Sequence, residues 1–358
     1  MEERIDEIVG AEVQPAEAPV IDEQARAAAI VKSARKIFSR IGFSSIAVLG
    51  ISVGAAALLA MIIAVAAPEF TSSGAGLLVI SVVSTHLIAI PLGCLIMRRI
   101  PKVFPQPEPF GIGKLLLCVP VCVFFAYVGQ LIGVLVSEFL SAAAGVPYED
   151  PTAGLAAPDI PFPVMLLCLV IVGPFMEELI FRRILIDRMC NYGEKLAIVT
   201  SAVMFGIFHG NIEQATYATL LGLIFGYVYL RTHNIWYTFA LHAFVNFYSG
   251  ALIAKVTSAG GVPELLEDLA AGASAGEIIE QYASDPSVLI FAAYVLFTAL
   301  LFVAGLVIFI VKIRKLHFYQ APLQLPKGRG FAAAWLNPGM ICFVITCIAY
   351  MCLSLAVL

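Results

Sequence analysis

The chain has 358 residues, of which 61% are hydrophobic and only 13% are charged, and its mean hydropathy is +0.95. A soluble globular protein is about 45–50% apolar and about 25% charged, so this composition excludes a soluble fold. The net charge of −4 is less informative than the positions of the charges, which form short clusters between long apolar runs.

Nine apolar stretches follow one another along the chain. They cover residues 43–67, 76–97, 114–136, 161–181, 196–209, 212–230, 234–254, 287–311 and 339–358. A helix needs about 20 apolar residues to span a bilayer, and most of these stretches approach that length. Because the runs are continuous and do not alternate apolar with polar residues, they exclude a membrane β-barrel. We therefore predict an all-α, polytopic membrane protein with about nine transmembrane helices.

The positions of Lys and Arg predict the orientation of these helices. If the N-terminus is cytoplasmic, 20 of the 21 Lys and Arg residues fall on the cytoplasmic side, and only Lys255 falls outside. The loops on the opposite side carry acidic residues instead. Because cytoplasmic loops of membrane proteins are enriched in Lys and Arg, we predict a cytoplasmic N-terminus and an external C-terminus.

The same patterns divide the chain into five segments. Residues 1–42 form an acidic and then basic cytoplasmic tail, and residues 43–136 form the N-terminal transmembrane helices. Residues 160–254 carry the motifs described below and are expected to form the functional core. Residues 255–286 form an external loop, and residues 287–358 form the C-terminal transmembrane helices.

Ionisable side chains inside the apolar runs are candidates for function, because burying them in a bilayer is costly. Those within or beside the runs are His86, Glu177, Glu178, His209, Glu213 and His242. His86 has no polar partner in its own sequence pattern, so we interpret it as a buried structural histidine. Glu213 follows the turn after the fifth stretch, where a carboxylate can stabilise the start of the next helix.

The fourth stretch ends in the pattern E-E-x-x-x-R. Glu178 and Arg182 are four residues apart, so they share a helix face and can form an ion pair. Glu177 points about 100° away from Glu178 and is left unpaired. Pro174 removes a backbone donor just upstream and is expected to widen the helix near this site. The alternative interpretation is a routine ion pair at a cytoplasmic helix end.

Two further patterns place polar groups four residues apart. The fifth stretch ends in Phe205-x-x-x-His209, and the seventh contains His242-x-x-x-Asn246. Residues at this spacing lie on one stripe of a helix. Taken alone, His209 is more typical of a structural histidine, and the His242–Asn246 stripe is equally typical of hydrogen bonding between membrane helices.

Together these groups fit the hydrolysis of a peptide bond. A carboxylate in an apolar site can act as a general base, and a nearby histidine can protonate the leaving amine. A His–Asn stripe can donate hydrogen bonds to the oxyanion that develops. The zinc motif H-E-x-x-H and the aspartyl motif G-x-G-D are absent, and we do not expect a serine nucleophile.

The three patterns, in this order on neighbouring stretches, resemble the CPBP family. This family includes type II CAAX prenyl proteases and bacteriocin-processing or abortive-infection membrane proteins. The resemblance covers about residues 160–250 and implies an intramembrane endopeptidase acting on membrane-associated or lipidated substrates near the cytoplasmic leaflet. The implied site residues are the catalytic Glu177, His209, His242 and Asn246, with supporting Glu178, Arg182 and Phe205.

The resemblance assigns a role to each of these residues. Glu177 would activate water together with His209, and His242 and Asn246 would form the oxyanion hole. Glu178 and Arg182 would be structural partners, and Phe205 would line the site. The implied partners are membrane lipid and a peptide or protein substrate, with no role for nucleic acid, and the implied location is a bacterial plasma membrane.

Metal dependence stays open at this point. A zinc ion would use Glu177, His209 and His242 as ligands. We favour a site without a cofactor, because these residues come from three separate stretches and lack the i, i+4 histidine pair typical of zinc sites on helices.

Two other functions remain as alternatives. One is a non-catalytic immunity or scaffold protein that keeps the same family core. The other is a proton-coupled transporter, in which buried Glu and His would relay protons. The transporter is less favoured, because the sequence shows no repeated halves with paired broken helices.

Overall fold

The computed structural model describes residues 22–145 and 160–357, and within these ranges every regular element is a helix. Six helical segments are long and apolar enough to cross a membrane: Glu23–Ala66, Gly74–Met97, Ile112–Ala144, Phe162–Tyr192, Ile235–Thr257 and Pro286–Ile313. The prediction of a polytopic helical membrane protein is therefore confirmed. Residues 1–21, with most of the acidic tail, and residues 146–159 of a predicted external loop lie outside the described residues.

The N-terminal elements are α2 (Glu23–Ala66), α3 (Pro68–Ser72), α4 (Gly74–Val82), the π-helix η1 (Val83–Ala89), α5 (Ile90–Met97) and α6 (Ile112–Ala144). The central elements are α7 (Phe162–Met165), the π-helix η3 (Leu166–Val172), α8 (Gly173–Glu178), the π-helix η4 (Leu179–Ile186), α9 (Asp187–Met189), η5 (Cys190–Tyr192), α10 (Glu194–Ile207) and α11 (Ile212–Thr232). The remaining elements are α12 (Ile235–Asn246), the π-helix η6 (Phe247–Leu252), α13 (Ile253–Thr257), α14 (Val262–Ala270), α15 (Ala275–Tyr282), α16 (Pro286–Ile313), α17 (Gly330–Trp335) and α18 (Pro338–Val357).

Three of the nine predicted stretches form helices that are not among the six long apolar segments. These helices are α10, with 14 residues, α11, with 21 residues, and α18, with 20 residues. The helices exist where the apolar pattern places them, but the number of membrane crossings stays a prediction.

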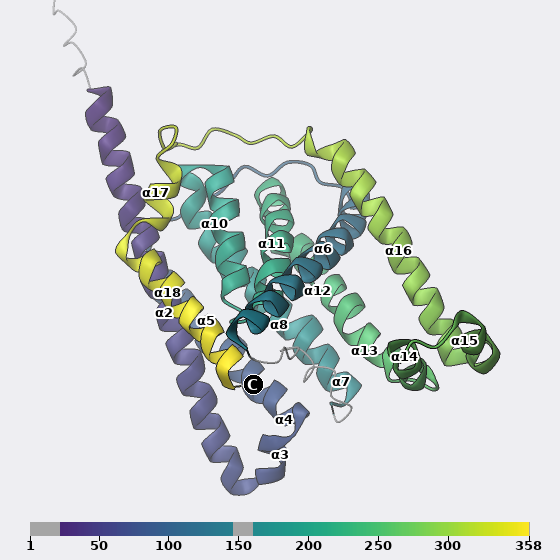
Figure 1. Ribbon diagram of the computed structural model, residues 1–358. Coiled ribbons are helices and arrows are strands. Elements are labelled where there is room, and N and C mark those ends of the chain that lie inside the picture. Colours follow the sequence, from purple (N-terminus) through teal and green to yellow (C-terminus); the bar gives the residue numbers. More distant parts are fainter. Residues whose placement is uncertain (1–21, 146–159, 358) are drawn as a thin grey trace, which may run out of the picture.

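The loops that carry the positive charges lie together at one end of the helices. Figure 1 shows the start of α2 and the segments that join α5 to α6 and α16 to α17 at one end, and α3, α7 and α14 at the other. At the first end Arg231 forms ion pairs with Glu108, at 2.8 Å, and with Glu194. Burial alone would raise the pKa of Glu108. The hydrogen bonds from His317 and Arg231 have the larger effect and lower this pKa to about 2. This clustering of the basic segments agrees with the arrangement that the charge distribution predicts.

The largest buried cluster joins the core segment to both ends of the described chain. It contains Phe38 of α2, Phe181 of η4, Phe205 of α10 and Phe343 of α18, all at most 2% exposed. Helices α2 and α18 meet through glycine: a Cβ on Gly42 would lie 2.3 Å from the Gly339 carbonyl carbon. The missing side chains therefore allow the two backbones to touch. The terminal helices α2 and α18 thus pack against the central helices η4 and α10.

Candidate functional site

Glu178 and Arg182 form a fully enclosed ion pair. Arg182 Nε lies 3.1 Å from Glu178 Oε2, and both side chains are 0% exposed. The Arg182 guanidinium lies 4.7 Å from the Phe205 ring centre and 5.6 Å from that of Phe225. Breaking a buried pair leaves an uncompensated charge, which is strongly destabilising. The pairing that the i, i+4 spacing predicts is present, and aromatic side chains shield it from solvent.

Glu177 lies on a different face of α8, between two histidines. Its Oε1 is 3.0 Å from His86 Nε2, and its Oε2 is 3.5 Å from His242 Nε2. Because an ionised carboxylate only accepts hydrogen bonds, His86 Nε2 is the donor in the shorter contact. The Glu177 side chain keeps 16% of its surface exposed, whereas Glu178 keeps none. Of the two adjacent carboxylates, only Glu177 is accessible to a water molecule.

His86 is the site residue that the sequence interpretation missed. It lies in η1, 91 residues before Glu177, and its Nδ1 is buried without a hydrogen-bond partner among the described residues. Its ring lies over Gly173, where a Cβ would be 3.8 Å from Nε2. The interpretation as a structural histidine is therefore incomplete, since the partner of His86 is the proposed catalytic carboxylate. The only signal in the sequence was the cost of burying an imidazole in an apolar run.

His242 contacts both glutamates. Its Nδ1 lies 3.0 Å from Glu178 Oε1, and its Nε2 faces Glu177. The ring stacks on Phe225 with centroids 5.3 Å apart and meets Phe205 edge-on at 5.6 Å. These contacts fix the ring, and they link the buried ion pair to the exposed carboxylate. Both nitrogens of His242 point at carboxylates, so its role as an oxyanion donor stays a prediction.

His209 follows the last turn of α10. Its Nδ1 lies 2.8 Å from the Phe205 carbonyl oxygen, which can only accept, so Nδ1 carries the hydrogen. In the neutral ring this leaves Nε2 as the basic nitrogen. The His209 ring meets the Phe205 ring edge-on, with centroids 5.0 Å apart, and Phe205 in turn contacts His242. Phe205 therefore lies between His209 and the group formed by Glu177, His86 and His242.

Pro174 changes the hydrogen bonding of the helix before Glu177. The Gly173 N–H bonds to the Cys168 carbonyl five residues back, which is the π-helical pattern of η3. The next donor in this pattern would be residue 174, but proline has no N–H, and the Leu169 carbonyl would lack a partner. Asn246 Nδ2 donates to that carbonyl at 2.8 Å. The predicted widening is present, and one hydrogen of the Asn246 amide is used to stabilise it.

The arrangement does not fit a zinc site. No group of three or more His, Cys, Asp or Glu side chains within residues 22–145 and 160–357 is placed to hold a metal ion. We therefore derive no step through a metal.

The letter pattern G-x-S-x-G of serine hydrolases occurs twice, but neither serine lies in this site. Ser52 hydrogen-bonds to Thr85 between membrane helices, at 2.6 Å. Ser274 caps the N-terminus of α15, where it forms a capping box with Glu277. A nucleophile elbow requires a strand-to-helix turn, and neither serine occupies one.

Comparison with known proteins agrees with the motifs. Residues 159–248 match the family model described as "Type II CAAX prenyl endopeptidase Rce1-like". The chain is also 34% identical over 85 residues to a protein of Bacillus subtilis (strain 168) named "Putative membrane peptidase YdiL". That similarity covers 24% of this chain and 35% of the relative, so the chain spans about a third of that protein's length. No solved structure matches. The family resemblance indicated by the three motifs is thus confirmed for residues 159–248.

Proposed function

We propose that the protein is an intramembrane endopeptidase that hydrolyses peptide bonds of membrane-associated or lipidated substrates. The observation that carries the proposal is the difference between two adjacent glutamates. Glu178 is neutralised by Arg182, while Glu177 is accessible and held between His86 and His242. An ion pair alone would stabilise a helix, but a second carboxylate among imidazoles in an apolar interior fits acid–base chemistry. The matched family and the relative's name, both of which denote peptidases, support this proposal.

In the proposed mechanism a water molecule lies between Glu177 and His209. Glu177 takes a proton from it, and the oxygen forms a bond to the carbonyl carbon of the substrate. The C–N bond then breaks as the proton passes to the leaving amine, through Glu177 or His209. All atoms of the products come from water and substrate, so the step balances.

The oxyanion is assigned to Asn246 and His242. The Asn246 amide has a second N–H beyond the one bound to Leu169, and this hydrogen can bind the carbonyl oxygen of the substrate. A donor that is already oriented stabilises the developing charge without further rearrangement. The hydrogen bond to Leu169 thus serves to orient the proposed oxyanion donor.

The proposed topology has nine crossings, with the N-terminus in the cytoplasm, the C-terminus outside and the chain in a bacterial plasma membrane. Residues 255–286 are then external. A single cysteine at Ser274 in a cysteine-free background should react with an impermeant reagent in intact cells. Labelling that requires permeabilised cells would refute this orientation.

The function is tested by comparing membranes that contain the wild type with membranes that contain Glu177→Gln. We expect new peptide termini, mapped by mass spectrometry, only in the wild-type membranes. Equal amounts of folded protein in both samples are the control. Identical termini in the two samples would instead favour a non-catalytic immunity or scaffold protein.

A further inference from the structure

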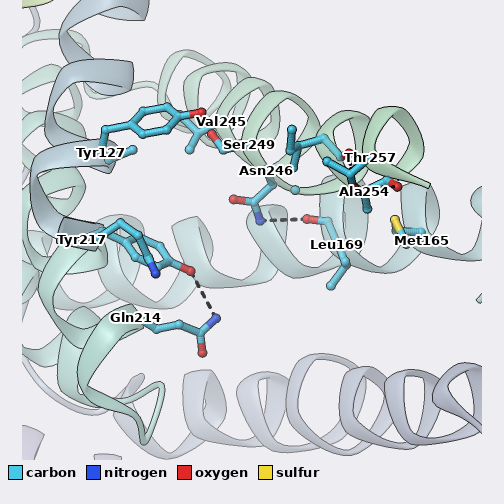
Figure 2. A pocket seen from close by; sticks show the side chains of 14 residues that line it. Tyr127, Met165, Leu169, Gln214, Tyr217, Val245, Asn246, Ser249, Ala254 and Thr257 are labelled. Atoms are coloured by element: carbon cyan, nitrogen blue, oxygen red, sulfur yellow. Dashed lines mark hydrogen bonds between the residues drawn. The ribbon is translucent and has the colours of Figure 1, made fainter. Parts of the chain in front are cut away.

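A cavity of about 490 Å³ lies beside Asn246. Asn246 is one helical turn after His242 on α12. The walls of the cavity come from α6, α7, η3, α11 and the segment from α12 to α13. Figure 2 shows Asn246 and Gln214 reaching into it from different helices. Small-molecule and cofactor sites have volumes of about 300–1,000 Å³, so this cavity is large enough for a ligand.

The cavity has a largely apolar wall that carries several polar side chains and no charge. The polar side chains are Tyr127, Gln130, Gln214, Tyr217, Asn246, Ser249 and Thr257, and none of the described lining residues is charged. The Ser249 hydroxyl is buried without a hydrogen-bond partner, and the Gln130 carboxamide makes no hydrogen bond within the described part of the chain. An unpartnered polar group in an apolar interior, such as the Ser249 hydroxyl, is costly. The polar, uncharged side chains that line the cavity suit a polar, uncharged ligand.

Carboxamides carry both N–H donors and a C=O acceptor, which are the groups that an extended peptide backbone needs. A membrane helix must unwind before its backbone can be cleaved, and its freed N–H and C=O groups then need new partners inside the bilayer. A prenyl or acyl chain would leave the Gln130 carboxamide without a hydrogen-bond partner. We propose that this cavity binds an unwound, uncharged stretch of a membrane-embedded polypeptide, and that the substrate is cleaved next to this stretch. The proposal rests on the proposed function.

The dimensions of the cavity agree with this ligand. Its lining runs from Val245 to Thr257 on one side, about 18 Å at about 1.5 Å per residue. This length holds about five residues of extended chain at about 3.4 Å each. Asn246 lines this cavity and is also the proposed oxyanion donor, so the bound stretch ends next to the scissile bond.

The cavity also indicates the kind of substrate. It extends toward Met165, near the start of the segment Phe162–Tyr192, and toward Thr257, at the end of the segment Ile235–Thr257. Arg182 and Arg183 lie further along the first of these segments, away from Met165. In the proposed topology the bound stretch lies in the outer half of the membrane, and the cleaved bond lies nearer the cytoplasm. Such a substrate crosses much of the bilayer, and differs from a lipidated tail that enters from the cytoplasm.

Direct binding tests this proposal without any turnover. The full-length Glu177→Gln protein in nanodiscs carries a photo-crosslinking residue at Ala254, which lines the cavity, or at Val303, which is 57% exposed on α16. The probe is a synthetic 24-residue peptide of Leu and Ala with an uncharged Gly-Ser centre. Its matched control has two Lys in the centre, and a farnesylated short peptide serves as competitor. We expect at least fivefold more crosslinking of the uncharged probe at position 254 than at 303, little with the Lys control, and no competition by the farnesyl peptide.

Kinetics with a cleaved peptide provide the second measurement. Gln130→Leu and Ser249→Ala should each raise KM about 3- to 10-fold with kcat unchanged, because each removes one hydrogen bond made equally to substrate and transition state. Ser137→Ala is the matched control, since that hydroxyl is also buried and unpartnered but does not line the cavity. Crosslinking at position 254 without cleavage by the wild type would keep this proposal and overturn the proposed function. Cleavage with unchanged KM in both variants, or displacement by the farnesyl peptide, would overturn this proposal.

Discussion

The two faces of α8 carry the same functional group in opposite surroundings. On one face Glu178 is buried with Arg182 behind aromatic rings, and on the other Glu177 is partly exposed among imidazoles. His242 contacts both carboxylates, and within residues 22–145 and 160–357 it is the side chain that links the two faces. The comparison shows how neighbouring carboxylates acquire different roles: one stabilises the helix packing, and the other is free to react. Each prediction below tests one part of this division.

The largest effect is expected from Glu177→Gln. An amide cannot accept the proton of water, so turnover should fall about 10²- to 10⁴-fold, the usual contribution of a general base. The thermal stability in detergent should stay close to the wild-type value, because no buried cation loses its partner. The measurement is peptide cleavage by the purified protein together with a melting curve. A variant that melts much earlier would show that Glu177 is structural.

Glu178→Gln should mainly destabilise the fold. It leaves Arg182 as an uncompensated buried charge, which typically costs about 3–5 kcal/mol. Chemical unfolding in detergent measures the loss, and the double variant Glu178→Gln with Arg182→Met should recover part of it. Equal losses of stability in Glu177→Gln and Glu178→Gln would contradict the division between the two faces.

Asn246→Ala should cost about 2–4 kcal/mol of transition-state stabilisation, as the loss of an oxyanion donor does, with little change in substrate binding. It also removes the partner of the Leu169 carbonyl. Adding Pro174→Ala restores a backbone N–H near that carbonyl. The double variant therefore separates the loss of the oxyanion donor from the loss of the hydrogen bond to Leu169. If the double variant regains stability but not kcat, Asn246 acts on the substrate. If it regains both, Asn246 only stabilises the π-helix.

His86→Leu should lower kcat about 10- to 150-fold, because a hydrogen bond to a charged group contributes about 1.5–3 kcal/mol. Since His86 positions Glu177 and does not itself touch the substrate, KM should change little. His86→Gln is the matched variant, because its amide can donate from nearly the same place as Nε2 and should restore much of kcat. If His86→Gln is no more active than His86→Leu, a hydrogen bond from position 86 does not position Glu177.

The smallest effect is expected from removing metal ions. If Glu177 and His209 activate water directly, exhaustive chelation should leave cleavage unchanged, and the purified protein should contain well under one zinc per chain. Metal analysis and the cleavage rate before and after chelation provide the measurement. Activity that is lost with chelator and regained with stoichiometric zinc would overturn the assignment.

The features that the sequence predicts correctly are local along one helix. The spacing of Glu178 and Arg182 places them on one face, and Pro174 predicts the widened helix before Glu177, because both depend on the helical period or on one missing N–H. The long apolar runs likewise predict helices. Such arguments need no knowledge of the neighbouring helix.

The features that it does not predict depend on which helices lie opposite each other. Nothing in the pattern around His86 indicates that η1 packs on α8, because only the folded chain brings those segments together. The bond from Asn246 to Leu169 and the double contact of His242 have the same cause. The sequence motifs name the reacting groups, and the packing determines which hydrogen bonds orient them.

The glycine contact between α2 and α18 has a consequence for biosynthesis. The Gly339 N–H bonds to the Ser39 hydroxyl at 3.0 Å, across 300 residues of sequence. While the ribosome makes the chain, α2 is complete long before α18, so the face of α2 around Ser39 and Gly42 stays without this partner until the last helix is made. Release of the chain before α18 is complete would therefore leave that face of α2 exposed.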